Sequence, residues 1–154
     1  MKQSYGILLY RWRLGKPEFF LVHPGGPFFV NKQAGSWTIP KGEANGDETP
    51  LHTAIREFEE ETGYRPSGHF IQLNPIVQKG GKQVHCWAVE GDLDATAIRS
   101  NTFELEWPPH SAKKQTFPEI DRAEWYCFEE ACKMINEKQY ELLLQFSNLA
   151  KNNI

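Results

Sequence analysis

Four glutamates stand within five consecutive residues of the chain, and their mutual repulsion needs a physical reason. They are Glu57, Glu59, Glu60 and Glu61. Like charges three or four residues apart on a helix destabilise it by roughly 0.2–0.5 kcal/mol per pair. No lysine is interspersed among them, so the group suits a hard divalent cation such as Mg²⁺ or Mn²⁺, which prefers carboxylate, water and phosphate oxygens. A solvated acidic helix face is the alternative interpretation.

The segment around these glutamates predicts a helix from Pro50 to Thr62. Thr49 can serve as the N-cap, proline is favoured at the first helical position, and Gly63 suits the left-handed position past the end. At about 100° per residue, one arc of this helix is apolar and is expected to pack on a sheet. That arc consists of Leu51, Ile55, Phe58 and Thr62.

A second arc of the same helix is acidic. Glu57, Glu60 and Glu61 share it, whereas Glu59 points roughly 160° away from Glu57. Arg56 flanks Glu60 and can hold it by a charge-assisted hydrogen bond. Two small residues one turn upstream are expected to leave room for a ligand beside the carboxylates; they are Thr53 and Ala54. The helix therefore predicts a metal site built from three carboxylates.

The glutamates belong to a longer pattern that runs from Gly42 to Tyr64. Its fixed positions are Gly42, Glu48, Arg56-Glu57-Phe58, Glu60-Glu61 and Gly63-Tyr64. This spacing resembles the Nudix box, with every fixed position matched. The resemblance implies an α/β fold, the Nudix α/β/α sandwich around a mixed β-sheet. It also implies an enzyme that binds a divalent metal, Mg²⁺ or Mn²⁺, and cleaves a phosphoanhydride of a nucleoside diphosphate linked to another group.

The resemblance further assigns roles to residues of the box. The implied metal ligands are the side chains of Glu57, Glu60 and Glu61, together with the main-chain carbonyl of Gly42. Glu48 would support the site, and Arg56 would orient the carboxylates. One of the three ligand glutamates is also a candidate for the base that deprotonates the attacking water. Ligands and base are the same residue type on the same face, so the identity of the base stays open.

Upstream of the box, the stretch from Trp37 to Glu43 carries a lysine where many family members have a second glycine. Its Trp-x-x-Pro-Lys-Gly pattern resembles members that act on dinucleoside polyphosphates and some that act on nucleoside triphosphates. Lys41 could hold a phosphate oxygen as a point charge, or be an ordinary loop lysine. Trp37 and Phe29 could stack on a base, or belong to the core. His23 could reach the ligand, or be structural.

Downstream of the box, one loop is locally basic on an otherwise acidic chain. It contains His110, Lys113 and Lys114, which could reach a polyphosphate tail or simply be solvated. Many Nudix enzymes recruit a further glutamate from outside the box. The candidate here is Glu119, with Glu104 and Glu106 behind it.

The elements that must position these residues are short and mixed in type. Strands are predicted over 5–12, 18–23, 37–39, 69–78, 83–91, 102–107 and 123–128, with a hairpin turn at 79–82. A C-terminal helical region is predicted over 128–148, broken near Lys138. Strands mixed with helices in this order indicate an α/β or α+β sandwich.

Composition sets the remaining bounds. The 154 residues fit one globular domain, residues 1–154, and the net charge of −3 gives no reason to expect a nucleic-acid or membrane partner. Cys86, Cys127 and Cys132 show neither disulfide nor zinc spacing, so reduced thiols and a cytoplasmic setting are expected. The N-terminal apolar stretch is too short for a signal peptide. A monomer and a homodimer both remain open.

These observations predict a metal-dependent pyrophosphohydrolase whose partner is a small-molecule nucleotide. The leading substrates are dinucleoside polyphosphates and nucleoside triphosphates. A housecleaning enzyme for oxidised nucleotides is the alternative within the enzyme class. A Nudix-like module that senses a nucleotide without cutting it is the alternative outside that class, although such modules tend to have lost box glutamates and this chain keeps them.

Overall fold

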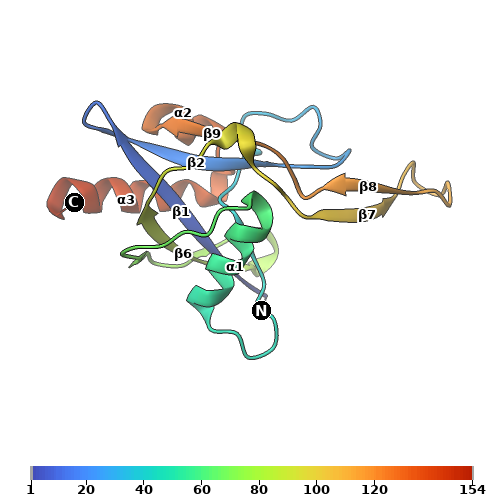
Figure 1. Cartoon of the computed structure of the whole chain (residues 1–154), viewed down its shortest axis with the longest axis horizontal. Coiled ribbons are helices and arrows are strands. Elements are labelled where there is room, and N and C mark those ends of the chain that lie inside the picture. Colours follow the sequence, from blue (N-terminus) through green and yellow to red (C-terminus); the bar gives the residue numbers. More distant parts are fainter. Residues whose placement is uncertain (1, 154) are drawn as a thin grey trace.

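The computed structural model describes residues 2–153, and a mixed β-sheet lies at their centre (Figure 1). The strand order is β4-β6-β1-β2-β9, with β3 paired to β1 and β5 paired to β6. β1 runs parallel to β6, and the other pairs are antiparallel. The strands of this sheet are β1 Gln3–Arg13, β2 Lys16–Pro24, β3 Lys41–Gly42, β4 Ile71–Gln72, β5 Ile76–Val77, β6 Gln83–Glu90 and β9 Ile120–Cys127.

Helices cover both faces of the sheet (Figure 1). One face carries α1 (Pro50–Thr62), and the other carries α2 (Phe128–Met134) and α3 (Tyr140–Asn153). Three short 3₁₀ segments complete the helical elements: η1 Lys79–Gly81, η2 Ala95–Ala97 and η3 Glu137–Gln139. The arrangement is the predicted α/β/α sandwich.

The apolar runs of β1 and β2 explain why both faces must be covered. Successive side chains of a strand point to opposite faces. Ile7 and Leu9 therefore pack in the same buried cluster as Phe58 of α1, while Leu8 and Phe19 pack with Phe146 of α3. These side chains are fully buried, so the central strands are apolar on both sides rather than alternating.

Helix α1 has the predicted bounds, Pro50 to Thr62, and its end is set by Gly63 at φ 83°. Thr49 has the extended backbone of an N-cap, but its side chain caps no backbone N–H. The expectation that Thr53 and Ala54 leave room for a ligand is wrong. Both are fully buried. Ala54 packs in the apolar core beneath the helix, so the small side chains let the helix approach the sheet.

Several predicted strands differ in extent. The strand expected over 37–39 is reduced to isolated bridges from Trp37 to Ile135 and from Thr38 to Val22. The segment 69–78 forms the two short strands β4 and β5 on one side of β6, with the predicted turn between β5 and β6. β9 closes the sheet against β2, and the C-terminal helix is interrupted at η3, as expected.

A separate two-stranded ribbon extends away from the sheet (Figure 1). It consists of β7 (Thr102–Glu106) and β8 (Lys114–Pro118). Its base is tied to α1, because Asn101 N donates to the Glu60 carbonyl at 2.9 Å. Phe28, in the loop that follows β2, packs edge-on against Trp107, which follows β7. Within residues 2–153, no helix is long and apolar enough to cross a membrane.

Candidate active site

Helix α1 is held against the start of β1 by the segment that precedes it. β3 pairs Gly42 with Tyr5 and Lys41 with Gly6. Gly6 allows this close approach, since a Cβ there would lie 2.7 Å from the Pro40 carbonyl oxygen. The start of the box therefore pairs with the central strand β1, and the helix of the box packs on the face of the same sheet.

Arg56 donates hydrogen bonds to three carboxylates, and the predicted contact with Glu60 is among them. Its Nε and Nη2 donate to the two oxygens of Glu48 at 2.8 and 3.0 Å. Its Nη1 donates to Glu57 at 3.0 Å and to Glu60 at 2.9 Å. Glu59 faces elsewhere and pairs with Arg65. One guanidinium thus holds three carboxylates by charge-assisted hydrogen bonds.

Glu48 is the most strongly stabilised anion of this group. The Arg56 hydrogen bonds hold the pKa of its carboxyl at about 2, with further donors in the Asn45 amide and the Thr53 hydroxyl. The hydrogen bonds that Arg56 donates to the carboxylates in turn raise the pKa of Arg56. Glu48 therefore remains ionised throughout the neutral range and anchors the guanidinium.

Glu57 and Glu61 are destabilised anions by comparison. Burial, followed by the charge of Glu57, raises the pKa of Glu61 well above its usual value. Burial also raises the pKa of Glu57, opposed by Arg56. Glu61 is 6% exposed, and the Lys41 backbone N–H donates to it at 3.1 Å. A cation beside these two carboxylates would relieve both burial and like-charge repulsion.

Gly42 makes space for Glu57. A Cβ at position 42 would lie 2.1 Å from the Glu57 carboxyl carbon. Any side chain at this position would therefore displace the carboxylate. The glycine of the box is explained here by close packing between the loop and the helix.

The donor chemistry fits Mg²⁺ or Mn²⁺, which the residues predicted as ligands would hold through carboxylate oxygens. Within residues 2–153, no three His, Cys, Asp or Glu side chains are gathered closely enough around one point to form a metal-binding group. Glu57 and Glu60 accept hydrogen bonds from Arg56, and Glu61 accepts one from the Lys41 amide. A cation would compete with these partners for the same oxygens.

Glu119 lies in the electrostatic range of the box although it is distant in sequence. It follows β8 directly, and its charge raises the pKa of both Glu57 and Glu61. Burial and the charge of Glu60 raise the pKa of Glu119 itself. The backbone of this segment is fixed by Glu119 N donating to the Asn101 carbonyl at 2.8 Å. Glu119 therefore interacts electrostatically with the glutamates of the box.

The other downstream candidates lie on the ribbon. Glu104 and Glu106 belong to β7, and the Glu106 carboxylate accepts from the backbone amides of His110 and Ala112. Lys113 precedes β8 and Lys114 begins it, where Lys114 pairs with Glu106 in register. These residues shape the outer end of the ribbon.

A cleft of about 450 Å³ adjoins the carboxylates at Lys41. Such a volume falls in the range of small-molecule sites. Its lining includes Phe29, Lys32, Ser36, Lys41, Gln78, Asn136 and Gln139. Burial and the charge of Lys82 lower the pKa of Lys41, while Glu61, Glu57 and Glu43 oppose that shift. Gln78 and Asn136 were not predicted as site residues, because only the paired strands and the C-terminal helices bring them to the cleft.

Trp37 and His23 lie beneath this cleft rather than in it. Trp37 is 1% exposed and packs against Tyr126 and His23. The His23 side chain is fully buried, and its ring nitrogens lie 2.7 Å from Asp121 and 2.6 Å from the Lys32 carbonyl oxygen. A nucleotide could contact either ring only after the surrounding residues moved.

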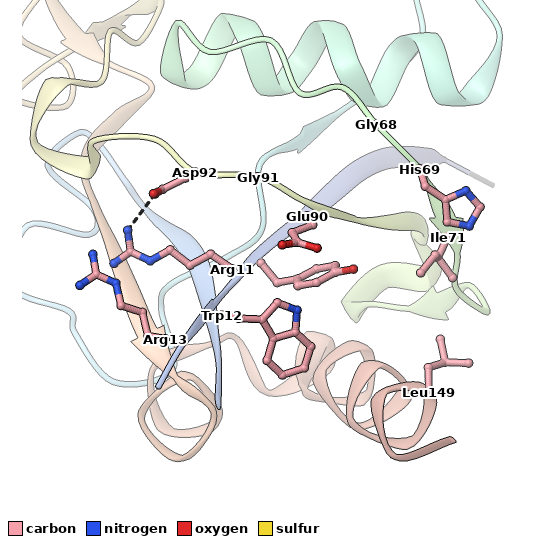
Figure 2. A pocket seen from close by; sticks show the side chains of 11 residues that line it. Arg11, Trp12, Arg13, Gly68, His69, Ile71, Glu90, Gly91, Asp92 and Leu149 are labelled. Atoms are coloured by element: carbon pink, nitrogen blue, oxygen red, sulfur yellow. Dashed lines mark hydrogen bonds and ion pairs between the residues drawn. The ribbon is translucent and has the colours of Figure 1, made fainter. Parts of the chain in front are cut away.

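A second cavity of about 950 Å³ lies at the far end of β1 (Figure 2). Figure 2 shows Arg11 paired with Asp92 on one side and Ile71 and Leu149 on the other. The box segment instead pairs with Tyr5 and Gly6 near the start of β1. This cavity is therefore separate from the carboxylates.

Residues 6–146 match the NUDIX domain family. The chain belongs to the Nudix family. It is 30% identical over 115 residues to the asymmetrical bis(5'-nucleosyl)-tetraphosphatase of Mus musculus, covering 71% of this chain and 67% of that protein. The predicted family and enzyme class are thereby confirmed, and the chain is a Nudix pyrophosphohydrolase. Nudix enzymes generally use divalent metals.

Solved Nudix structures have the same fold. The Caenorhabditis elegans Ap4A hydrolase in a binary complex superposes with a TM-score of 0.65 at 25% identity, covering 98% of each chain. The Nudix domain of Shewanella oneidensis NrtR, complexed with ADP ribose, gives a TM-score of 0.68 at 15% identity, covering 97% of this chain and 88% of that one. The latter likeness concerns the fold alone.

Proposed function

We propose that this Nudix enzyme hydrolyses a phosphoanhydride of a dinucleoside polyphosphate, using Mg²⁺ or Mn²⁺ held by Glu57, Glu60 and Glu61. The observation that carries the proposal is that Lys41 contacts both the carboxylates and the cleft. Its backbone amide donates to Glu61 at 3.1 Å, and the same residue lines the cleft of about 450 Å³. A nucleotide in the cleft would thus place its phosphates beside the carboxylates.

The roles of the box residues follow from their contacts. A bound divalent cation would neutralise phosphate oxygens and activate water for in-line attack. Arg56 and Glu48 hold the carboxylate face in position, and Gly42 lets the loop lie against Glu57 and offers its main-chain carbonyl. Glu119 is the proposed carboxylate from outside the box, because its charge acts on both Glu57 and Glu61.

Lysines at the cleft would bind the phosphate chain. Lys41 is half-buried next to Glu61, and the charge of Lys82 acts on its pKa. Lys32 also lines the cleft. Lys113 and Lys114, at the outer end of the ribbon, are proposed to meet only the distal part of a long substrate. This local positive charge on a chain of net charge −3 favours a substrate with several phosphates.

The likeness to the mouse tetraphosphatase favours a dinucleoside polyphosphate over a nucleoside triphosphate or an oxidised nucleotide. A module that only senses a nucleotide is disfavoured by the complete set of box glutamates. The carboxylates that a sensor could discard are instead tied together by Arg56.

The test is product analysis with Mg²⁺ or Mn²⁺ against a panel of substrates. The panel contains diadenosine tetraphosphate, ordinary and oxidised nucleoside triphosphates, and ADP-ribose, with Glu60→Gln as the control. We expect asymmetric cleavage of diadenosine tetraphosphate that is lost in the control. Preferred cleavage of an oxidised triphosphate would replace the proposed substrate, and binding without cleavage of any compound would contradict the enzymatic assignment.

A further inference from the structure

The loop 25–36, which follows β2, is fastened to the sheet by a buried histidine. The side chain of His23 is 0% exposed. Its Nδ1 lies 2.7 Å from the Asp121 carboxylate, and its Nε2 lies 2.6 Å from the Lys32 carbonyl oxygen. Both partners are acceptors, so both contacts are hydrogen bonds when the ring carries a proton on each nitrogen. His23 thereby joins the loop to β9.

An irregularity in the sheet aims Asp121 at this histidine. His23 pairs with Arg122, but the next residue, Pro24, pairs with Ile120. Asp121 is left as the extra residue of a bulge in β9. Bulges re-aim a side chain and are frequent beside active sites. Without this bulge, the alternation of β9 would not place the Asp121 carboxylate against the His23 ring.

Two further contacts tie the same loop to β9. Arg122 donates to the Gln33 side chain at 2.7 Å and lies 5.3 Å from the ring centroid of Trp37. Gly25 N donates to the Glu119 carbonyl at 2.8 Å. The loop in turn supplies one wall of the cleft next to Lys41, through the residues Phe29, Lys32, Gln33, Ala34, Gly35 and Ser36.

We propose that His23 and Asp121 are positioning residues that keep the loop 25–36 in the conformation that binds substrate. The inference rests on the proposed function, since it takes the Lys41 cleft as the nucleotide site. If the competent loop conformation becomes a minority, apparent affinity falls in proportion to its population. The chemical step at α1 is unchanged once substrate is bound, so the effect belongs to KM rather than kcat.

The test combines steady-state kinetics with hydrogen–deuterium exchange on Asp121→Asn. The Asp121 side chain is 31% exposed, so the variant should fold. We expect KM for diadenosine tetraphosphate to rise about tenfold, corresponding to about one molecule in ten with the loop ordered. kcat should stay within about threefold, because only ground-state binding is affected. Exchange of the 25–36 amides should accelerate.

The matched control is Asp92→Asn, which removes the carboxylate partner of Arg11 at the far end of β1. It should change neither KM nor exchange in 25–36. Arg122→Met is a second variant that keeps packing on Trp37 and leaves His23 in place. It should shift both readouts in the same direction by about threefold, corresponding to a smaller loss of the ordered population.

If amide exchange of the loop 25–36 is unchanged in both variants, the proposed anchoring of this loop by His23 and Asp121 is wrong, whatever the activity. Faster exchange with unchanged KM would overturn its link to substrate binding. If the native enzyme cleaves no nucleotide, the proposed function fails, and exchange alone then supports or overturns the anchor.

Discussion

At the scale of single residues, the box is a balance between one cation and several anions. Arg56 satisfies Glu48, Glu57 and Glu60 at once, whereas the buried Glu61 is left with a backbone amide. A buried carboxylate is costly unless positive charge compensates it, and the charge of Lys41 only partly offsets the effect of burial on Glu61. We therefore propose that an additional positive charge binds close to Glu61.

Gly42→Ala tests the packing of the loop against this site. The new Cβ would clash with the Glu57 carboxylate, which lies 2.1 Å away. Residues that support metal ligands typically change activity by roughly 10–100-fold, and we expect a loss of kcat/KM in this range. The measurement is kcat/KM at saturating Mn²⁺. Gly15→Ala, with open space around its Cβ in the β1–β2 turn, serves as the control, and equal activities for the two variants would contradict the role of Gly42.

Glu48→Gln tests the ion pair with Arg56 through pH. The pKa of Glu48 is lowered from 4.5 to about 2 in the folded protein, so its stabilising effect is complete above about 4.5 and is lost as the pH falls through about 2. The melting temperature of the variant should therefore lie below that of the native protein at pH 7. The gap should close between pH 4.5 and pH 2. A gap that is constant with pH would show that the carboxylate charge is not responsible.

Contacts inside the box could be predicted from the sequence because the spacing of its residues is specific and local. The contacts of Arg56 and the isolation of Glu59 are confirmed by the structure. Gln78 and Asn136 could not be predicted, because they reach the cleft only through the pairing of β5 with β6 and the packing of the C-terminal helices. The contact of His23 with Asp121 likewise depends on a bulge in a strand that lies about a hundred residues downstream.

At the scale of elements, the residue types at the two ends of a helix were the most informative signal in the sequence. Pro50 and Gly63 set the bounds of α1 because proline fixes φ in the first turn and glycine readily adopts the left-handed φ past the end. The strands over 37–39 and 69–78 were overestimated, since their propensity could not reveal that only two-residue stretches find a partner strand. The segment 102–107 forms the ribbon with β8 because its partner strand is close in sequence.

Gly63→Ala tests the end of α1. The residue has φ 83°, and an added Cβ would lie 3.3 Å from the Arg99 side chain. We expect the free energy of unfolding to fall by about 1–2 kcal/mol, the cost of a side chain in the left-handed region. Urea denaturation measures it. Gly80→Ala is a comparison with φ 83° but no neighbours within 4 Å; a smaller loss for Gly63→Ala than for Gly80→Ala would contradict the packing against Arg99.

The ribbon and the cleft make different demands on their lysines. Lys41→Ala should raise KM for diadenosine tetraphosphate by roughly tenfold or more, as expected for removing a charged hydrogen-bond donor. The double change Lys113→Ala with Lys114→Ala should have an effect of less than about threefold, because these side chains lie at the outer end of the ribbon. Steady-state kinetics on the same substrate decides between them. A larger effect from the ribbon would move the phosphate site to it.

At the scale of the whole molecule, the sandwich follows from burying two apolar faces. The runs in β1 and β2 needed cover on both sides, which the helices after β3 and after β9 supply. This much was predictable from composition and order. The link between cleft and carboxylates at Lys41 was not, because it depends on how the segment before β3 meets η3, where the Ile39 amide donates to the Gln139 side chain.

Thiol reactivity tests the packing of the whole fold. Cys86 is buried and burial raises its pKa, Cys132 is partly buried, and Cys127 is exposed. A thiol reagent at pH 8 should modify Cys127 first and Cys132 more slowly. Cys86 should react only after unfolding in guanidinium chloride. Rapid reaction of Cys86 in the native protein would contradict the placement of β6 between β1 and the short strands β4 and β5.

The most direct test of the central claim is the turnover of diadenosine tetraphosphate as Mg²⁺ or Mn²⁺ is titrated into metal-free enzyme, compared between the native protein and Glu57→Gln. We predict no turnover after chelation, full recovery on adding either metal, and a loss of at least about 10²-fold in the variant at saturating metal. Turnover that persists without metal, or a variant as active as the native enzyme, would contradict the assignment of the carboxylate face of α1 as the catalytic metal site.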